Sequence, residues 1–147
     1  MTPVSNPWLL AAGGGSITAA LLHLACMIGG PGWFRFLGAG EGVAQAVEQG
    51  RIPPYAMTAG IAAVLLGWGY YAFAAAGLAP RPPLIRLGLI AITVVLLVRA
   101  FALFYPDFWL PEHTRAFQIV SSLIVLALGL SFLFGTIRAW PVLSMRS

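Results

Sequence analysis

Two polar side chains lie within long apolar stretches of this sequence, where an imidazole or a charge needs a chemical reason to be present. His23 follows Ala11, Gly15 and Ala19 at four-residue spacing, so on a helix it shares a face with small residues that let another helix approach. Arg99 lies about five residues, roughly 8 Å of helix rise, inside the end of its stretch. An ionisable side chain at that depth in a membrane helix is a candidate functional residue.

Each of these two residues also has a structural interpretation. The imidazole of His23 can bond across helices to a hydroxyl or carbonyl group. The guanidinium of Arg99 can extend to the headgroup region or neutralise a carboxylate in a connection. Both residues fall at about the same depth below one end of their stretches. They therefore line one pocket if the two helices face each other.

Polar residues in the neighbouring connections are candidate partners for that pocket. A buried guanidinium needs a compensating group, and we expect one of the nearby carboxylates to supply it. For Glu41 the alternative is a solvated position on the polar face of a short helix. The candidate ligand-binding residues are therefore His23, Glu41, Arg99, Asp107, Glu112 and His113.

Metal sites, cofactors and covalent catalysis are not predicted. His23, His113 and a carboxylate would supply three metal ligands, but no two of them lie one turn apart on a helix. Haem held between two histidines would need His113 to reach His23, and two histidines in 147 residues give little support for it. Cys26 is the single cysteine, which excludes a disulfide framework. The sequence shows no nucleophile, histidine and acid in an order typical of covalent catalysis.

Length and composition indicate that lipid surrounds these residues. Of the 147 residues, 60% are hydrophobic and 8% are charged, whereas soluble domains carry about 25% charged residues. The net charge of +4 is spread between apolar runs, so no nucleic-acid partner is predicted.

Strands of a membrane β-barrel are shorter and alternate in polarity. Four stretches are long enough for a helix across a hydrocarbon core of about 30 Å: residues 8–28, 55–78, 84–104 and 116–137. The sequence predicts an all-α membrane protein, a four-transmembrane-helix bundle that forms one domain over residues 1–147 in the lipid bilayer.

The connection between the first two stretches is more than a linker. Apolar residues recur at helical spacing from Trp33 to Val47, and Glu41, Gln45 and Glu48 line the opposite face. This pattern predicts a short amphipathic helix at the membrane interface, loosened by glycines at 38, 40 and 42.

The placement of arginine predicts the orientation, because short basic connections stay in the cytoplasm. One side holds Arg81, Arg86, Arg138 and Arg146. The other side holds all four acids together with Arg35, Arg51 and Arg115. We therefore expect the N-terminus and the C-terminus in the cytoplasm and the acidic connections outside.

Small residues on the second and last stretches predict close helix packing. Gly60 and Gly67 thin the second stretch, and Ala127, Ser131 and Gly135 form a stripe on the last. We expect these residues to pack within the chain, and contact between copies is the alternative. The aromatic residues near the end of the third stretch, including Phe108 and Trp109, are expected to face lipid or the interface.

A histidine and three short motifs resemble those of uncharacterised short bacterial four-span membrane proteins. They are His23 followed by Gly29-Gly30-Pro31-Gly32-Trp33, then Gly38-Ala39-Gly40-Glu41 and Gly50-Arg51-Ile52-Pro53. The resemblance covers about a third of the chain. It implies a four-span fold in a bacterial inner membrane and implies no activity.

Two functional hypotheses of different classes follow. The first is a non-catalytic accessory or structural bundle, in contact with a membrane protein partner or with further copies of itself. The second is an outward-facing binder or enzyme for a lipidic or small anionic ligand that uses His23, Glu41 and Arg99. We favour the first.

Overall fold

The computed structural model describes residues 6–109 and 111–145, and these residues contain helices and no β-strand. Four of the helices are long and apolar enough to cross a membrane, which identifies an integral membrane protein and confirms the predicted all-α bundle. Three of the spans are α1 (Pro7–Gly29), α4 (Ile52–Ala75) and α6 (Arg115–Ser144), and the fourth, Ile85–Phe104, is formed by α5 (Ile85–Phe101) and the 3₁₀ turn that follows it. Between these α-helices lie the short helices α2 (Pro31–Phe36) and α3 (Glu41–Glu48) and the 3₁₀ turns η1 (Ala102–Phe104) and η2 (Pro106–Phe108).

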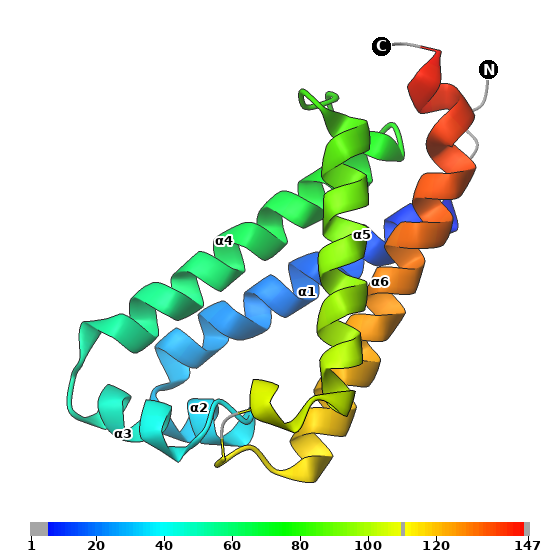
Figure 1. Ribbon diagram of the computed structural model, residues 1–147. Helices are drawn as coiled ribbons and strands as arrows, with labels where there is room; N and C mark the ends of the chain where they lie inside the picture. Colours follow the sequence, from blue (N-terminus) through cyan, green and yellow to red (C-terminus); the bar gives the residue numbers. More distant parts are fainter. Residues whose placement is uncertain (1–5, 110, 146–147) are drawn as a thin grey trace.

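The long helices form two antiparallel pairs. Figure 1 shows α1 beside α4 and α5 beside α6, and α1 also packs against α6. The helix α4 packs mainly against α1 and touches α5 and α6 much less. The described chain begins and ends at the same end of the bundle, which we call the terminal end (Figure 1). The opposite end carries α2, α3 and the connection 102–114, and we call it the capped end.

Close contacts between the long helices depend on glycine. A Cβ atom at Gly13 would lie 2.8 Å from the ring of Phe73 on α4. A Cβ atom at Gly135 on α6 would lie 2.7 Å from the Leu9 side chain and 3.0 Å from its backbone nitrogen. Asn6 strengthens the same junction, because it caps α1 and its side-chain nitrogen donates to the Gly135 carbonyl at 2.8 Å. These contacts fix α1 between α4 and α6.

Proline and glycine shift the helix ends away from the sequence prediction. The helix α4 begins before residue 55 because Pro53 and Pro54 occupy its first turn, where proline costs no intrahelical hydrogen bond. It ends before residue 78, and Gly77 follows with a φ of 85°. The helix α6 continues past residue 137 and through Pro141, and this extension buries Leu143 in the core.

The predicted amphipathic helix after α1 is two helices, α2 and α3. Gly38 and Gly40 have φ values of 79° and 98°, which glycine adopts without steric cost, so the chain turns between them. Phe34, Ala44 and Val47 are buried against Cys26 at the end of α1. The expected polar face of α3 is confirmed as exposed. The capped end is therefore a folded layer packed onto the bundle.

Candidate functional site

Glu41 belongs to an ion-pair group that joins α2 to α3. The Nε and Nη2 atoms of Arg35 donate to the two carboxylate oxygens of Glu41, each at 2.8 Å, and Nη1 lies 2.8 Å from Glu48. Hydrogen bonds from Arg35 lower the pKa of Glu41, and those carboxylates raise the pKa of Arg35. Glu41 thus forms its ion pair with Arg35 and not with Arg99.

The imidazole of His23 bonds to its own helix. Its Nδ1 atom lies 2.7 Å from the carbonyl oxygen of Ala19, one turn earlier in α1. Because a carbonyl oxygen only accepts, Nδ1 is the donor in this hydrogen bond. The sequence-based expectation of a bond across helices is wrong, since the preceding turn offers an acceptor on the same helix face.

Arg99 lies against aromatic rings and not against a carboxylate. Its Cζ atom is 4.4 Å from the centroid of the Trp109 ring and 5.3 Å from that of Phe108. Its Nη1 atom is buried and has no hydrogen-bond partner among the described residues. The expected carboxylate partner is a wrong prediction, because the turns η1 and η2 fold the aromatic rings back over the guanidinium. Cation–π attraction takes the place of an ion pair.

Trp109 holds this arrangement in position. Its indole nitrogen donates to the carbonyl oxygen of Ala102 at 3.0 Å, which ties the connection to the end of α5. The ring is buried, so the expectation that it faces lipid is wrong for this residue. Its ring centroid is 6.0 Å from that of His113, and the His113 and Phe117 centroids are 4.8 Å apart. His113 thus packs in an aromatic cluster at the start of α6.

The two remaining candidate acids differ in their surroundings. One carboxylate oxygen of Glu112 accepts a hydrogen bond from the Gly42 nitrogen at 3.1 Å. This carboxylate lies at the N-terminus of α3, where the helix dipole favours a negative charge and Gly40 offers no capping side chain. Asp107 is exposed in η2 and has no ion pair or side-chain hydrogen bond to another described residue. Glu112 therefore links the α5–α6 connection to the layer formed by α2 and α3, which we call the capping layer.

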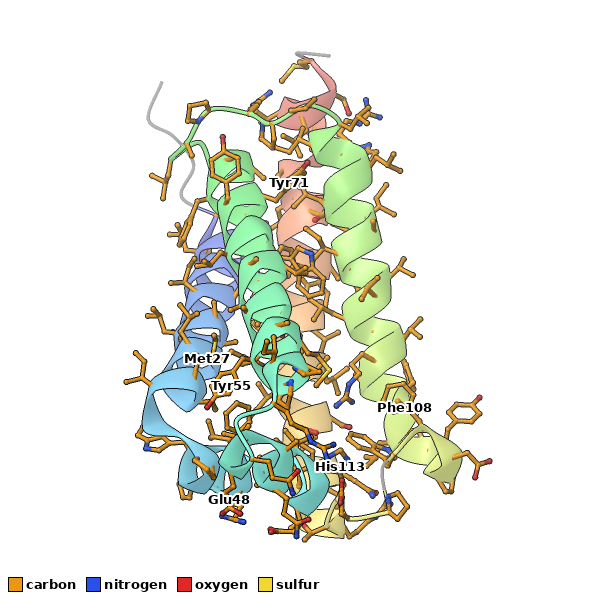
Figure 2. The ribbon with its side chains drawn as sticks, turned by 90° about the vertical axis from the view of Figure 1, so that its left-hand side faces the viewer. Met27, Glu48, Tyr55, Tyr71, Phe108 and His113 are labelled. Atoms are coloured by element: carbon orange, nitrogen blue, oxygen red, sulfur yellow. The ribbon has the colours of Figure 1, made fainter. Side chains whose placement is uncertain are left out.

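Glycine allows that link to form. A Cβ atom at Gly40 would lie 2.7 Å from a carboxylate oxygen of Glu112. A Cβ atom at Gly38 would collide with the ring of Phe117. The linker between α2 and α3 consequently rests directly on the end of α6. Figure 2 shows Glu48 and His113 together at the capped end, far from Tyr71.

The structure does not bring His23, Glu41 and Arg99 into one pocket. The first bonds to its own helix, the second to Arg35 and the third packs on Trp109. The three residues do lie toward the same end of the bundle, the capped end, with Glu41 in the capping layer. This part of the sequence prediction matches the structure. No three histidine, cysteine or acidic side chains within residues 6–109 and 111–145 are grouped to hold a metal ion.

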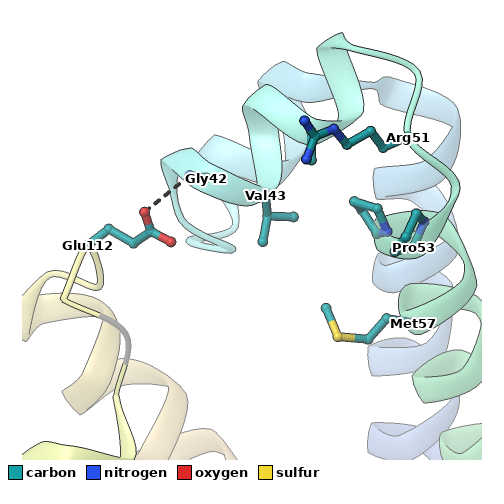
Figure 3. A pocket seen from close by; sticks show the side chains of 8 residues that line it. Gly42, Val43, Arg51, Pro53, Met57 and Glu112 are labelled. Atoms are coloured by element: carbon teal, nitrogen blue, oxygen red, sulfur yellow. Dashed lines mark hydrogen bonds between the residues drawn. The ribbon is translucent and has the colours of Figure 1, made fainter.

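A cavity of about 320 Å³ lies at the capped end, between α3, the start of α4 and Glu112. Figure 3 shows Glu112 on one side of it and Arg51, Pro53 and Met57 on the other. From the sequence, Arg51 contributes to the predicted orientation and to one of the resembling motifs, and neither Arg51 nor Met57 is predicted as a site residue. The sequence feature that could have indicated this site is an arginine directly before a membrane helix whose first turn contains proline.

Comparison of the chain with protein-family models, curated proteins and solved structures returned no match.

Proposed function

We propose that this chain is a non-catalytic accessory protein of a membrane assembly, which contributes helix surface to the assembly. The observation that carries this proposal is the use made of its polar side chains. Those of His23, Glu41, Arg99 and Glu112 each make a contact that holds the fold together. The alternative, a ligand site built from His23, Glu41 and Arg99, has less support because these three lie in separate surroundings.

The helix α4 offers the surface through which a partner would bind. Gly60 and Gly67, contrary to the expectation of packing within the chain, have no other side chain within 4 Å of a Cβ atom built on them. With Ala56 and Ala63 they form one exposed face, which helical periodicity puts opposite the face packed on α1. Small residues on such a face let a second transmembrane helix approach closely.

The location and orientation belong to the same proposal. We assign the terminal end to the cytoplasm, because Arg81, Arg86 and Arg138 lie there and the acids lie at the capped end. Arg146 lies outside the described residues. A bacterial inner membrane is proposed on the resemblance of the sequence motifs.

The test is purification of the tagged full-length protein from its native membrane in mild detergent. A stoichiometric protein partner, or a defined homo-oligomer, supports the proposal. Gly60→Leu and Gly67→Leu should abolish the association, whereas Gly14→Leu, at an equally open position on α1, should leave it intact. A monomer that retains neither a protein partner nor a second copy under all mild conditions would contradict it.

Orientation is tested separately by labelling introduced cysteines with a membrane-impermeant reagent. The native Cys26 is first replaced by serine. We expect a cysteine at position 48 to react from outside intact cells and one at position 81 to stay protected. The reverse pattern would overturn the assigned orientation without affecting the accessory role.

A further inference from the structure

The cavity at the capped end carries two opposite charges that no residue of the described chain neutralises directly. The guanidinium of Arg51 is exposed and makes no ion pair or hydrogen bond to another described side chain. Glu112 uses one carboxylate oxygen for the Gly42 nitrogen and has no cationic partner in the described part of the chain. Figure 3 shows the two side chains reaching toward the cavity from opposite sides. A ligand that carries both charges would be matched at both.

The wall between these charges is apolar. Val43, Pro53 and Met57 line the cavity below the polar groups. Its volume of about 320 Å³ lies at the lower end of the range for small-ligand sites. The space is therefore suited to a headgroup and the first atoms below it, and not to an entire lipid.

The apolar wall continues along α4 toward the middle of the bundle. Met57, Ile61 and Val64 follow at spacings of four and three residues, so they lie on one face. Their exposures of 56%, 40% and 50% mean that no other part of the described chain covers this face. At 1.5 Å per residue, Met57 to Val64 spans about 10 Å. The contact of Tyr71 with Gly88 on α5 closes the space near the terminal end.

We propose that this cavity binds a zwitterionic phospholipid with a primary ammonium group, of the phosphatidylethanolamine class. The phosphate pairs with the Arg51 guanidinium, whose planar donors suit phosphate oxygens. The ammonium group donates to the free oxygen of Glu112, and an acyl chain lies along Met57, Ile61 and Val64. A lipid of the phosphatidylglycerol class would match Arg51 but would bring no cation to offset the repulsion between Glu112 and its phosphate, and a choline headgroup has no N–H to donate.

The position of the cavity fits a lipid of the surrounding bilayer. It lies where α4 begins, beside the short helices of the capping layer, and therefore at the level where headgroups meet the apolar spans. Trp33 and Phe36 are exposed on the same layer, as expected for residues that meet the interface. The lipid would reach the cavity from the side, without leaving the membrane.

The experiment measures lipid binding to the purified full-length protein by native mass spectrometry, with phosphatidylethanolamine, phosphatidylcholine and phosphatidylglycerol of identical acyl chains. We expect one phosphatidylethanolamine to bind about tenfold more tightly than either other lipid, the effect of one charged hydrogen bond. Arg51→Gln should weaken the binding of all three lipids about tenfold, because each of them carries the phosphate that the guanidinium contacts. Because the Arg51 side chain makes no contact that holds the fold, this variant should fold as the wild type does.

Glu112→Gln provides the complementary measurement. It should weaken phosphatidylethanolamine about tenfold and strengthen phosphatidylglycerol, because the repelling charge is gone. Arg81→Gln at the terminal end and Asp107→Asn at the capped end are the matched controls, and neither should change any of the affinities.

Three results would overturn the proposal. The first is equal binding of the three lipids to the wild type, and the second is an Arg51→Gln variant that binds all three as tightly as Arg81→Gln does. The third is competition by soluble phosphoethanolamine at the concentration of the lipid itself, which would leave no role for the apolar face of α4. None of these results bears on the association of α4 with a protein partner.

Discussion

The pairing of Arg99 with Trp109 makes a quantitative prediction. Replacing Arg99 with Met keeps most of the side-chain volume but removes the charge. The loss of a cation–π contact on a buried indole costs about 1 to 1.5 kcal/mol. The substitution also removes a buried Nη1 donor that has no partner in the described residues. Leaving such a donor unpaired costs about 1 to 3 kcal/mol, so its removal raises the free energy of unfolding. We therefore expect Arg99→Met to change the free energy of unfolding by between about −0.5 and +2 kcal/mol.

A double-mutant cycle isolates the contact between the two side chains. With Trp109→Leu in place, the cation–π contact is already lost, so Arg99→Met should stabilise the protein by about 1 to 1.5 kcal/mol more than it does in the wild type. The free energy of unfolding is measured by titrating the protein in mild detergent with a denaturing detergent and following helicity by circular dichroism. Val98→Met, an exposed neighbour on α5, is the control and should show no coupling to Trp109→Leu.

The magnitudes separate this interpretation from the one that the sequence suggested. If a carboxylate were the true partner of Arg99, Arg99→Met would leave that acid buried and unpaired and would cost about 3 to 5 kcal/mol. A loss of that size, or additive effects of Arg99→Met and Trp109→Leu, would refute the cation–π arrangement.

Three further predictions concern the capping layer and the helix contacts. Glu112→Gln keeps an acceptor for the α3 N-terminus but removes the negative charge, so the free energy of unfolding should fall by about 0.3 to 1 kcal/mol; an equal effect in high salt would contradict the dipole argument. Gly135→Ala should destabilise the protein by about 1 to 3 kcal/mol, because the added methyl group meets the α1 backbone. Gly14→Ala, which meets open space, should cost nothing, and equal thermal midpoints for the two alanine variants would sink the packing argument. Since Arg35 holds the pKa of Glu41 below its ordinary value, this ion pair stabilises the fold above about pH 4.3 and is lost as the pH falls through the lowered pKa. Glu41→Gln should therefore reduce the loss of thermal stability between pH 5 and pH 3, and an unchanged acid profile would be evidence against that role.

The long helices could be predicted from sequence because membrane spanning depends on local properties. A run of about 20 apolar residues must form a helix in lipid, whatever its neighbours are. The ends were less predictable, since Pro141 is compatible with both a helix end and a continuing helix. The burial of Leu143 favours continuation, and that burial depends on helices that are distant in sequence.

The partners of the polar side chains could not be predicted in the same way. Arg99 faces Trp109 because two 3₁₀ turns reverse the chain between them. Glu112 reaches Gly42 across 70 residues of sequence. Hydrogen bonds and ring contacts act over a few ångströms, so each side chain takes the nearest suitable group, and hydropathy contains no information about which group is nearest.

The sequence by itself determined that the chain is an all-α bundle of four membrane-spanning helices with a polar face on α3, because each of these features follows from periodicity and length. Only the tertiary structure decided that α2 and α3 are separate helices, that His23, Glu41 and Arg99 lie apart, and that Arg51 and Glu112 flank one cavity. The physical reason is that these features depend on where glycine turns and helix crossings direct each side chain, and those directions are set by contacts between segments far apart in the chain.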